Sequence, residues 1–161
     1  MDVLTLLEDN AFAAYLRESL FAYPLLLTAH AIGMGFIVGL NAAISLRILG
    51  FAPGLPLAPM KKFFPLMWIG FWVNAISGFV LLFAFATKNF TDPVFYAKLG
   101  FIGLAVVNLR LIGQTSFHNP APAGANPWNA KALAAASLVF WAGAILTGRF
   151  MAYQFFRFWE H

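Results

Sequence analysis

The stretch FAYPLLLTAHAIGMGFIVGLNAAISLRIL occupies residues 21–49 and contains no acidic, lysine or arginine side chain before Arg47. A helix crosses the hydrocarbon core of a bilayer, which is roughly 30 Å thick, with about 20 mostly apolar residues at about 1.5 Å each. The stretch therefore predicts a first membrane-spanning helix. Three further stretches satisfy the same criterion, and they are residues 63–87, 93–116 and 131–156.

The composition of the whole chain agrees with a membrane protein. Apolar residues make up 61% of the 161 residues and charged residues only 10%, whereas soluble domains carry about 25% charged residues. The absence of cysteine excludes disulfides, thiolate metal sites and cysteine nucleophiles. The net charge of +4 is scattered between apolar runs, so no basic patch predicts a nucleic-acid partner. We predict an all-α integral membrane protein whose main partner is the lipid bilayer.

The connections between the four stretches predict their topology. Residues 50–59 and 119–128 are rich in proline, and residues 87–92 form a short polar turn. Short connections make consecutive helices antiparallel neighbours, which favours a single domain over residues 1–161 with four transmembrane helices in an up-down bundle. The basic pair Lys61–Lys62 adjoins a span, whereas the N-terminal tail is acidic, so we place this pair in the cytoplasm and both termini outside.

The segment before the first span has a different pattern. Charged side chains interrupt apolar ones over residues 3–19, and the acidic start is unlike the basic start of a secretory signal. Such a pattern is typical of an amphipathic helix that lies in the membrane interface. A frayed tail is the alternative interpretation.

Ionisable side chains inside spans are costly and therefore mark candidate functional sites. His30 lies about 10 Å past the start of the first span at 1.5 Å per residue. Lys98 lies near the start of the third span, and Arg149 lies near the end of the fourth. In an up-down bundle these three ends share one side, so three basic side chains from three helices are expected at one depth.

This convergence points to a cofactor with anionic groups. A neutral imidazole is a good axial ligand of haem iron, so His30 is the candidate metal ligand. Lys98 and Arg149 would pair with the haem propionates. Met34 shares the helical stripe of His30, and Gly33 leaves room for a flat ligand or for a closely packed helix. The bland alternative is a histidine hydrogen-bonded to a neighbouring helix, with basic side chains that extend to the interface.

A second basic group is expected at the opposite ends of the spans, where Arg47, Arg110 and His118 lie. His118 is some 30 Å from Lys98 along a helix axis, so it cannot ligate the same iron as His30. Interfacial anchoring is the simplest role for this group, and a second cofactor or an anionic lipid is the alternative.

Several short motifs are spread over nearly the whole chain: His30–Gly33, Gly39, Leu46–Gly50, Trp68–Gly70, Ser77–Gly78, Pro93 with Lys98–Leu99, and Gly148–Tyr153. With these motifs the chain resembles a family of four-span bacterial inner-membrane proteins to which no activity is assigned. The resemblance implies the bacterial inner membrane as the location, and the charge pattern described above then makes the termini periplasmic.

More remotely, the first and third spans are similar to the copper-resistance D superfamily, which includes the J-type protoporphyrinogen oxidase. His30, Gly33 and Lys98 match its His-x-x-Gly and its lysine early in a later span, and in the oxidase branch such a histidine is linked to haem b. That branch also has a histidine about a dozen residues after the lysine, where this chain has Asn108, Leu109 and Arg110. The resemblance therefore implies haem more than it implies oxidase activity.

These observations lead to one expected function and two alternatives. The expected function is a haem b protein that transfers electrons between the quinone pool and a partner. The first alternative is a cofactor-free accessory subunit of a larger respiratory or photosynthetic complex, or a homo-oligomer. The second is a porphyrinogen-oxidising or copper-handling membrane protein.

Overall fold

A computed structural model describes residues 9–118 and 127–157 of the chain, and these residues are helical with no strand. The elements in chain order are α2 (Ala11–Glu18), α3 (Ala22–Leu49), η1 (Ala58–Lys62), α4 (Phe63–Ala84), α5 (Ala86–Thr91), α6 (Pro93–Gly113), η2 (Gln114–His118) and α7 (Pro127–Arg157). Four helices are long and apolar enough to cross a membrane, as the four apolar stretches of the sequence predict.

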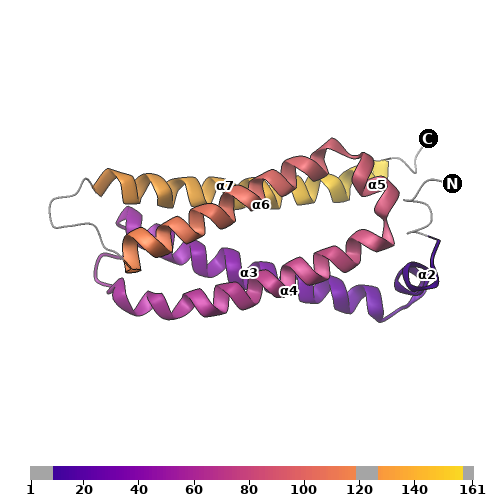
Figure 1. Cartoon of the computed structure of the whole chain (residues 1–161), viewed down its shortest axis with the longest axis horizontal. Coiled ribbons are helices and arrows are strands. Elements are labelled where there is room, and N and C mark those ends of the chain that lie inside the picture. Colours follow the sequence, from indigo (N-terminus) through magenta and orange to yellow (C-terminus); the bar gives the residue numbers. More distant parts are fainter. Residues whose placement is uncertain (1–8, 119–126, 158–161) are drawn as a thin grey trace.

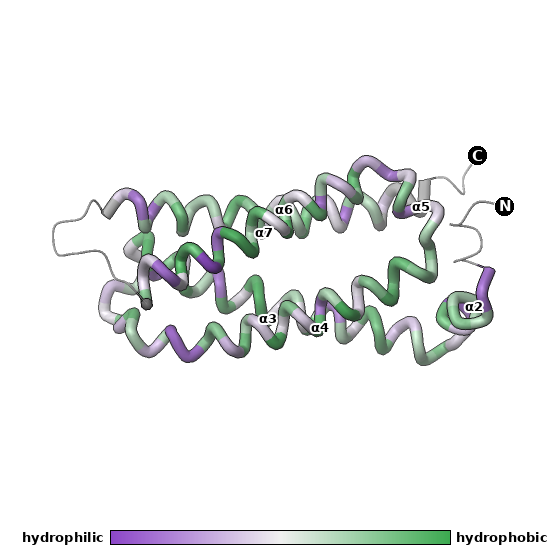
Figure 2. Tube along the Cα trace, in the orientation of Figure 1, coloured by the Kyte–Doolittle hydropathy of each residue, from purple (hydrophilic) through white to green (hydrophobic). Residues whose placement is uncertain are grey.

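The four long helices lie side by side along one axis (Figure 1). α3 packs against α4, α6 packs against α7, and α3 also packs against α7. The α3–α4 connection and the start of α7 lie at one end of the molecule, whereas α2, α5 and the last turns of α7 lie at the other. We call the first the Lys61 end and the second the α2 end. Figure 2 shows hydrophobic residues along most of the length of the long helices.

The helix boundaries follow local chemistry. Pro93 opens α6, and the Asp92 side chain accepts a 2.8 Å hydrogen bond from the Val94 N–H, which caps the helix. Gly50 ends α3 with a φ of 109°, a left-handed conformation that favours glycine. The second predicted span extended to residue 87, but α4 ends at Ala84 because the backbone of Phe85 leaves the helical region, and the short helix α5 follows.

The N-terminal segment contains a helix that docks on the bundle. Of the predicted residues 3–19, those before residue 9 lie outside the described part, and α2 covers Ala11–Glu18. Ala13 and Leu16 are buried, whereas Phe12 and Tyr15 are exposed. The Arg17 guanidinium donates a 3.0 Å hydrogen bond to the Ala84 carbonyl at the end of α4. This bond satisfies a carbonyl that the helix end leaves free.

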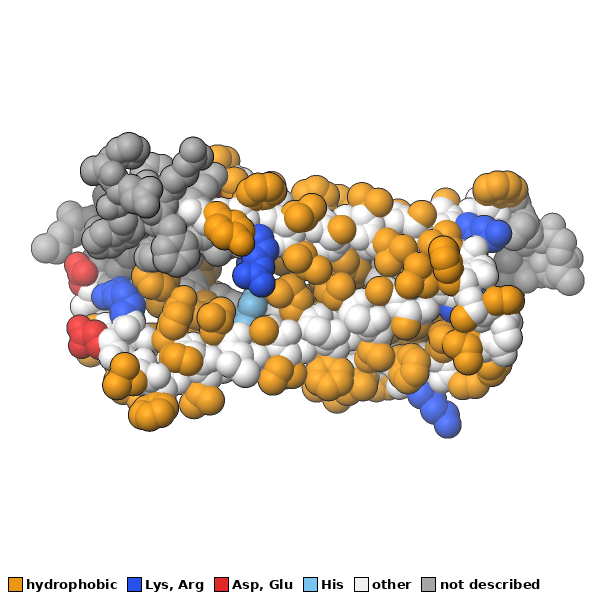
Figure 3. All heavy atoms as spheres, turned by 180° about the vertical axis from the view of Figure 1, so that it is seen from behind, with side chains coloured by type: hydrophobic (Ala, Val, Ile, Leu, Met, Phe, Trp, Pro, Cys, Tyr) orange, Lys and Arg blue, Asp and Glu red, His pale blue; other side chains and the backbone are white. Residues whose placement is uncertain are grey.

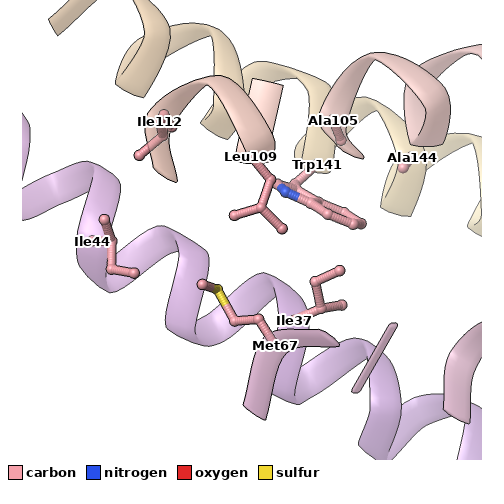
Figure 4. Packing of buried hydrophobic residues seen from close by; sticks show 8 residues of the cluster. All are labelled: Ile37, Ile44, Met67, Ala105, Leu109, Ile112, Trp141 and Ala144. Atoms are coloured by element: carbon pink, nitrogen blue, oxygen red, sulfur yellow. The ribbon is translucent and has the colours of Figure 1, made fainter. Parts of the chain in front are cut away.

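Large apolar side chains cover the outside of the molecule as well as its centre. Figure 3 shows them in orange along the length of one face, and Ile69, Trp72, Ile76 and Phe79 of α4 are each about 60% exposed. Such a surface suits contact with lipid chains. The core itself draws on all four long helices, and Figure 4 shows its eight members: Ile37, Ile44, Met67, Ala105, Leu109, Ile112, Trp141 and Ala144.

Candidate functional site

His30 lies where α3 meets α4, and its ring is held by two residues of α4. Nδ1 of His30 lies 3.0 Å from Oγ of Ser77. The ring also covers Gly78, because a Cβ built on Gly78 would lie 3.0 Å from Cε1 of the imidazole. A glycine at residue 78 therefore leaves the space that this ring position needs.

The hydrogen bonds of Ser77 favour one tautomer of His30. Ser77 Oγ lies 2.6 Å from the carbonyl oxygen of Val73, and a carbonyl can only accept. This short contact favours donation of the single hydroxyl proton within α4, and Oγ is then the acceptor of Nδ1–H of His30. Nε2 then keeps its lone pair, which is the form of a neutral imidazole that binds a metal while its other nitrogen is hydrogen-bonded.

The close approach of α3 and α4 sets this geometry. A Cβ built on Gly33 would lie 2.8 Å from both the Asn74 nitrogen and the Gly70 oxygen. A Cβ built on Gly70 would lie 2.9 Å from the Gly33 oxygen. The Asn74 side chain donates a 2.8 Å hydrogen bond to the His30 carbonyl. The register that pairs Gly33 with Gly70 and Asn74 also brings Ser77 opposite His30.

Lys98 of α6 comes to the same region from the other helix pair. Its positive charge is close enough to His30 to interact with the imidazole. Its methylene stem and amine lie along α7 at Gly148, where a built Cβ would be 3.7 Å from Cε and 3.8 Å from Nζ. Figure 3 shows the pale blue of a histidine beside the blue of basic side chains near the middle of the molecule.

The remaining residues of the predicted cofactor site are placed as follows. The space beside Gly33 is occupied by the backbone of α4. This glycine therefore allows the close contact between the two helices and leaves no room for a flat ligand. Met34 is half-buried one turn after His30. Arg149 directly follows Gly148, the residue on which Lys98 lies, and is exposed. The structure thus brings His30 and Lys98 together, with Arg149 next to the helix turn that Lys98 contacts.

The second basic group is divided between different roles. The Arg47 guanidinium donates to the carbonyl oxygens of Pro53 and Leu55, which holds the α3–α4 connection. Arg110 lies over the ring of Trp68, with its guanidinium carbon 5.2 Å from the ring centre. His118 ends η2, and its side chain lies outside the described part.

A separate polar group lies in the core between α3, α6 and α7. The Asn41 amide donates a 2.7 Å hydrogen bond to Ser137, and both side chains are buried. Within the described part of the chain, four buried atoms have no hydrogen-bond partner: Asn41 Oδ1, Ser45 Oγ, Asn108 Oδ1 and Trp141 Nε1. Asn41 and Asn108 are thus buried polar side chains.

Sequence reasoning missed Ser77 and Gly78 as partners of His30. Both were visible only as part of a family-like motif. An antiparallel register for the first two spans, anchored on Gly33 and Gly70, would have found them. Among residues 9–118 and 127–157, no group of three or more His, Asp or Glu side chains gathers in one place.

Comparison of the chain with protein-family models, curated proteins and solved structures gives no significant match.

Proposed function

We propose that the chain is a haem b-binding membrane protein that transfers electrons between a quinone pool and a redox partner. The observation that carries this proposal is the state of His30. Its Nδ1 lies 3.0 Å from Ser77 Oγ, which lies 2.6 Å from the Val73 carbonyl oxygen, and this chain of contacts favours the tautomer that leaves Nε2 as a ligand atom. A bound b-type haem would supply the one-electron chemistry, while the chain supplies ligation, orientation and a low-dielectric setting.

Each residue near His30 has a defined part in this proposal. Ser77 fixes the ring orientation and favours the tautomer that leaves Nε2 unprotonated. Gly78 leaves the space that the ring needs. Lys98, and Arg149 beside the same turn of α7, provide positive charge for carboxylates of a cofactor. A buried anion requires such partners.

We further propose that the protein is an up-down bundle in a bacterial inner membrane, with periplasmic termini and α2 as an amphipathic helix at the interface. The alternation of the helix connections between the two ends supports the bundle topology. Lys61 and Lys62 directly precede α4, and a basic pair beside a span favours a cytoplasmic location. Buried Leu16 and exposed Arg17 and Glu18 support two unlike faces on α2.

The test is an absorption spectrum of the purified protein, first oxidised and then reduced with dithionite, after expression with added haem. We expect a Soret band and sharp reduced α and β bands, all lost in His30→Ala. His118→Ala is the matched control, because it removes a histidine at the Lys61 end and should leave the spectrum unchanged. Ser77→Ala should keep the bands but weaken haem binding by about 10- to 100-fold. Losses of this size follow removal of the hydrogen bond that orients a metal-ligating histidine through its other ring nitrogen.

A colourless protein would overturn the proposal, as would a His30→Ala variant with an unchanged spectrum. One observation then favours a second candidate, a cofactor-free subunit of a larger membrane complex. Gly35 and Gly39 lie on an exposed face of α3, and a Cβ at either would meet nothing within 4 Å. Small residues four apart allow another transmembrane helix to approach closely. This candidate predicts that His30→Ala leaves assembly with the partner unchanged.

A further inference from the structure

A groove lies on the outside of the molecule between α4 and α6, towards the Lys61 end. Its volume is about 430 Å³, and its walls are Phe64, Trp68, Leu109, Arg110, Gly113 and Gln114. α4 and α6 meet there through side chains: a Cβ on Gly113 would lie 3.0 Å from the Phe64 ring. Most of the lining is apolar, and Arg110 is its charged member.

The charge of this end of the molecule is uniform. Arg47, Lys61, Lys62, Arg110 and Lys131 belong to it, and the sequence has no acidic residue over 47–62 or 110–131. The acidic residues of the described part, Asp9, Glu18 and Asp92, lie instead by α2 and at the start of α6. Figure 3 shows acidic side chains, in red, at that end only of the visible face. The groove therefore opens at an end that attracts anions.

Position along the helices indicates what kind of anion fits. Phe64 is the second residue of α4, two residues after Lys62, and Trp68 lies about one turn further. Arg110 lies in the last turn of α6. Trp and Arg at such positions are typical of the level of lipid headgroups. At this level the groove combines apolar walls with the guanidinium of Arg110. The walls suit an acyl chain, and the guanidinium suits a phosphate.

We propose that the groove between α4 and α6 is a binding site for an anionic phospholipid. The headgroup phosphate pairs with the Arg110 guanidinium, whose carbon lies 5.2 Å from the centre of the Trp68 ring, and Gln114 belongs to the same lining. One acyl chain lies along Trp68 and Leu109. The site requires that α4 and α6 cross the bilayer, and it is independent of any cofactor at His30.

Trp68 allows the site to be probed directly by fluorescence quenching. The protein is reconstituted in phosphatidylcholine vesicles with 20 mol% phosphatidylglycerol, in which either lipid is replaced by its brominated form. The emission of Trp68 is obtained as the difference between the protein and its Trp68→Phe variant. We expect brominated phosphatidylglycerol to quench this emission with an apparent affinity about fivefold higher than brominated phosphatidylcholine, as one arginine near an anionic headgroup implies.

Two variants test the part of Arg110, each in the Trp68 and Trp68→Phe background. Arg110→Gln should abolish the preference, so that both lipids quench with equal apparent affinity. Arg110→Lys should retain most of the preference, and this result would show that substitution at residue 110 leaves the fold intact. Lys131→Gln is the matched control, since it removes a charge from the same end but not from the groove, and it should keep the preference. Equal quenching by both lipids in the unmodified protein would overturn the proposal. A preference for phosphatidylglycerol that survives Arg110→Gln would also overturn it. So would displacement of the bound brominated lipid by ubiquinone but not by excess unbrominated phosphatidylglycerol.

Discussion

Two polar regions on α3 lie less than 20 Å apart along the helix, at about 1.5 Å per residue, yet they are organised in opposite ways. Around His30, the side chains of Ser77 and Asn74 bond to the ring and to the backbone carbonyl. Around Asn41, one bond to Ser137 joins two buried side chains, and several neighbouring polar atoms have no partner in the described part. The first region is half-exposed and satisfied, whereas the second is buried and incompletely satisfied.

The difference indicates what each region contributes. An unpaired polar atom in an apolar interior costs free energy, so the Asn41 region is retained at the expense of stability. The His30 region costs little, because its polar groups are paired, and it keeps one ring nitrogen for other chemistry. The two regions thus differ in how completely their polar groups are paired, and substitutions in them should have effects of different size and sign.

The largest expected effect is at the contact that positions the His30 region. Gly33→Ala and Gly70→Ala each insert a Cβ within 3 Å of backbone atoms of the opposite helix. Because backbone cannot move aside as a flexible side chain can, α3 and α4 must separate. We expect each substitution to lower the free energy of unfolding by about 1–3 kcal/mol. Titration with sodium dodecyl sulfate in mixed micelles measures this change.

Gly35→Ala and Gly39→Ala are matched controls on the same helix, since their added Cβ meets nothing within 4 Å. They should be neutral, or slightly stabilising because alanine has the higher helix propensity. If all four alanine variants lost the same stability, the loss would reflect glycine content in α3 and α4 and not a close helix contact.

The next effect in size is that of Ser77→Ala. The substitution removes the acceptor of Nδ1–H and leaves the ring in place. We expect a loss of about 0.6 kcal/mol, with an upper bound near 1.7, as measured for hydrogen bonds between transmembrane helices. A double-mutant cycle with His30→Ala isolates the pair, and a coupling energy of zero would mean that the two side chains do not interact.

The sequence predicts positions along a single helix better than it predicts contacts between two helices. The length of the apolar stretches alone predicts the four long helices. The first is an example, since α3 begins at Ala22 and ends at Leu49, within a residue of the predicted bounds. The end of α4 differs, since the turn of the backbone at Phe85 leaves no trace in hydropathy. The fourth helix begins before residue 131 because Pro127 is accepted at a first helical position.

Side-chain partners were harder to predict, because they depend on how each helix is rotated. Counting residues places His30 and Lys98 at a similar depth, and the structure brings them into electrostatic range. The same counting grouped Arg47 with Arg110, although Arg47 donates hydrogen bonds to loop carbonyls and Arg110 lies over the ring of Trp68. Depth is a one-dimensional quantity, whereas the choice of neighbour follows from contacts such as Gly33 with Gly70.

A smaller effect is expected when the bonded pair of the second region is replaced as a whole. Ser137→Ala alone removes the acceptor of the Asn41 amide and should cost about 0.6 kcal/mol. Adding Asn41→Leu removes the remaining polar groups of the pair, and replacing both partners by apolar side chains is nearly neutral. The double variant should therefore unfold within about 0.5 kcal/mol of the unmodified protein. A double variant less stable than the single one would show that Asn41 has a further stabilising contact.

A similarly small effect, but of opposite sign, is expected for Ser45→Ala. Ser45 is fully buried, and its hydroxyl has no hydrogen-bond partner in the described part of the chain. Alanine removes that oxygen with almost no change in the shape of the backbone or of the Cβ, so the protein should become more stable by about 0.5 kcal/mol. The same substitution at Ser77 destabilises, because that oxygen bonds to His30 and Val73. The two serine-to-alanine variants are matched in chemistry, and unfolding both in the same micelles compares the regions directly. If they changed stability in the same direction, the contrast between a paired and an unpaired hydroxyl on these two helices would be wrong.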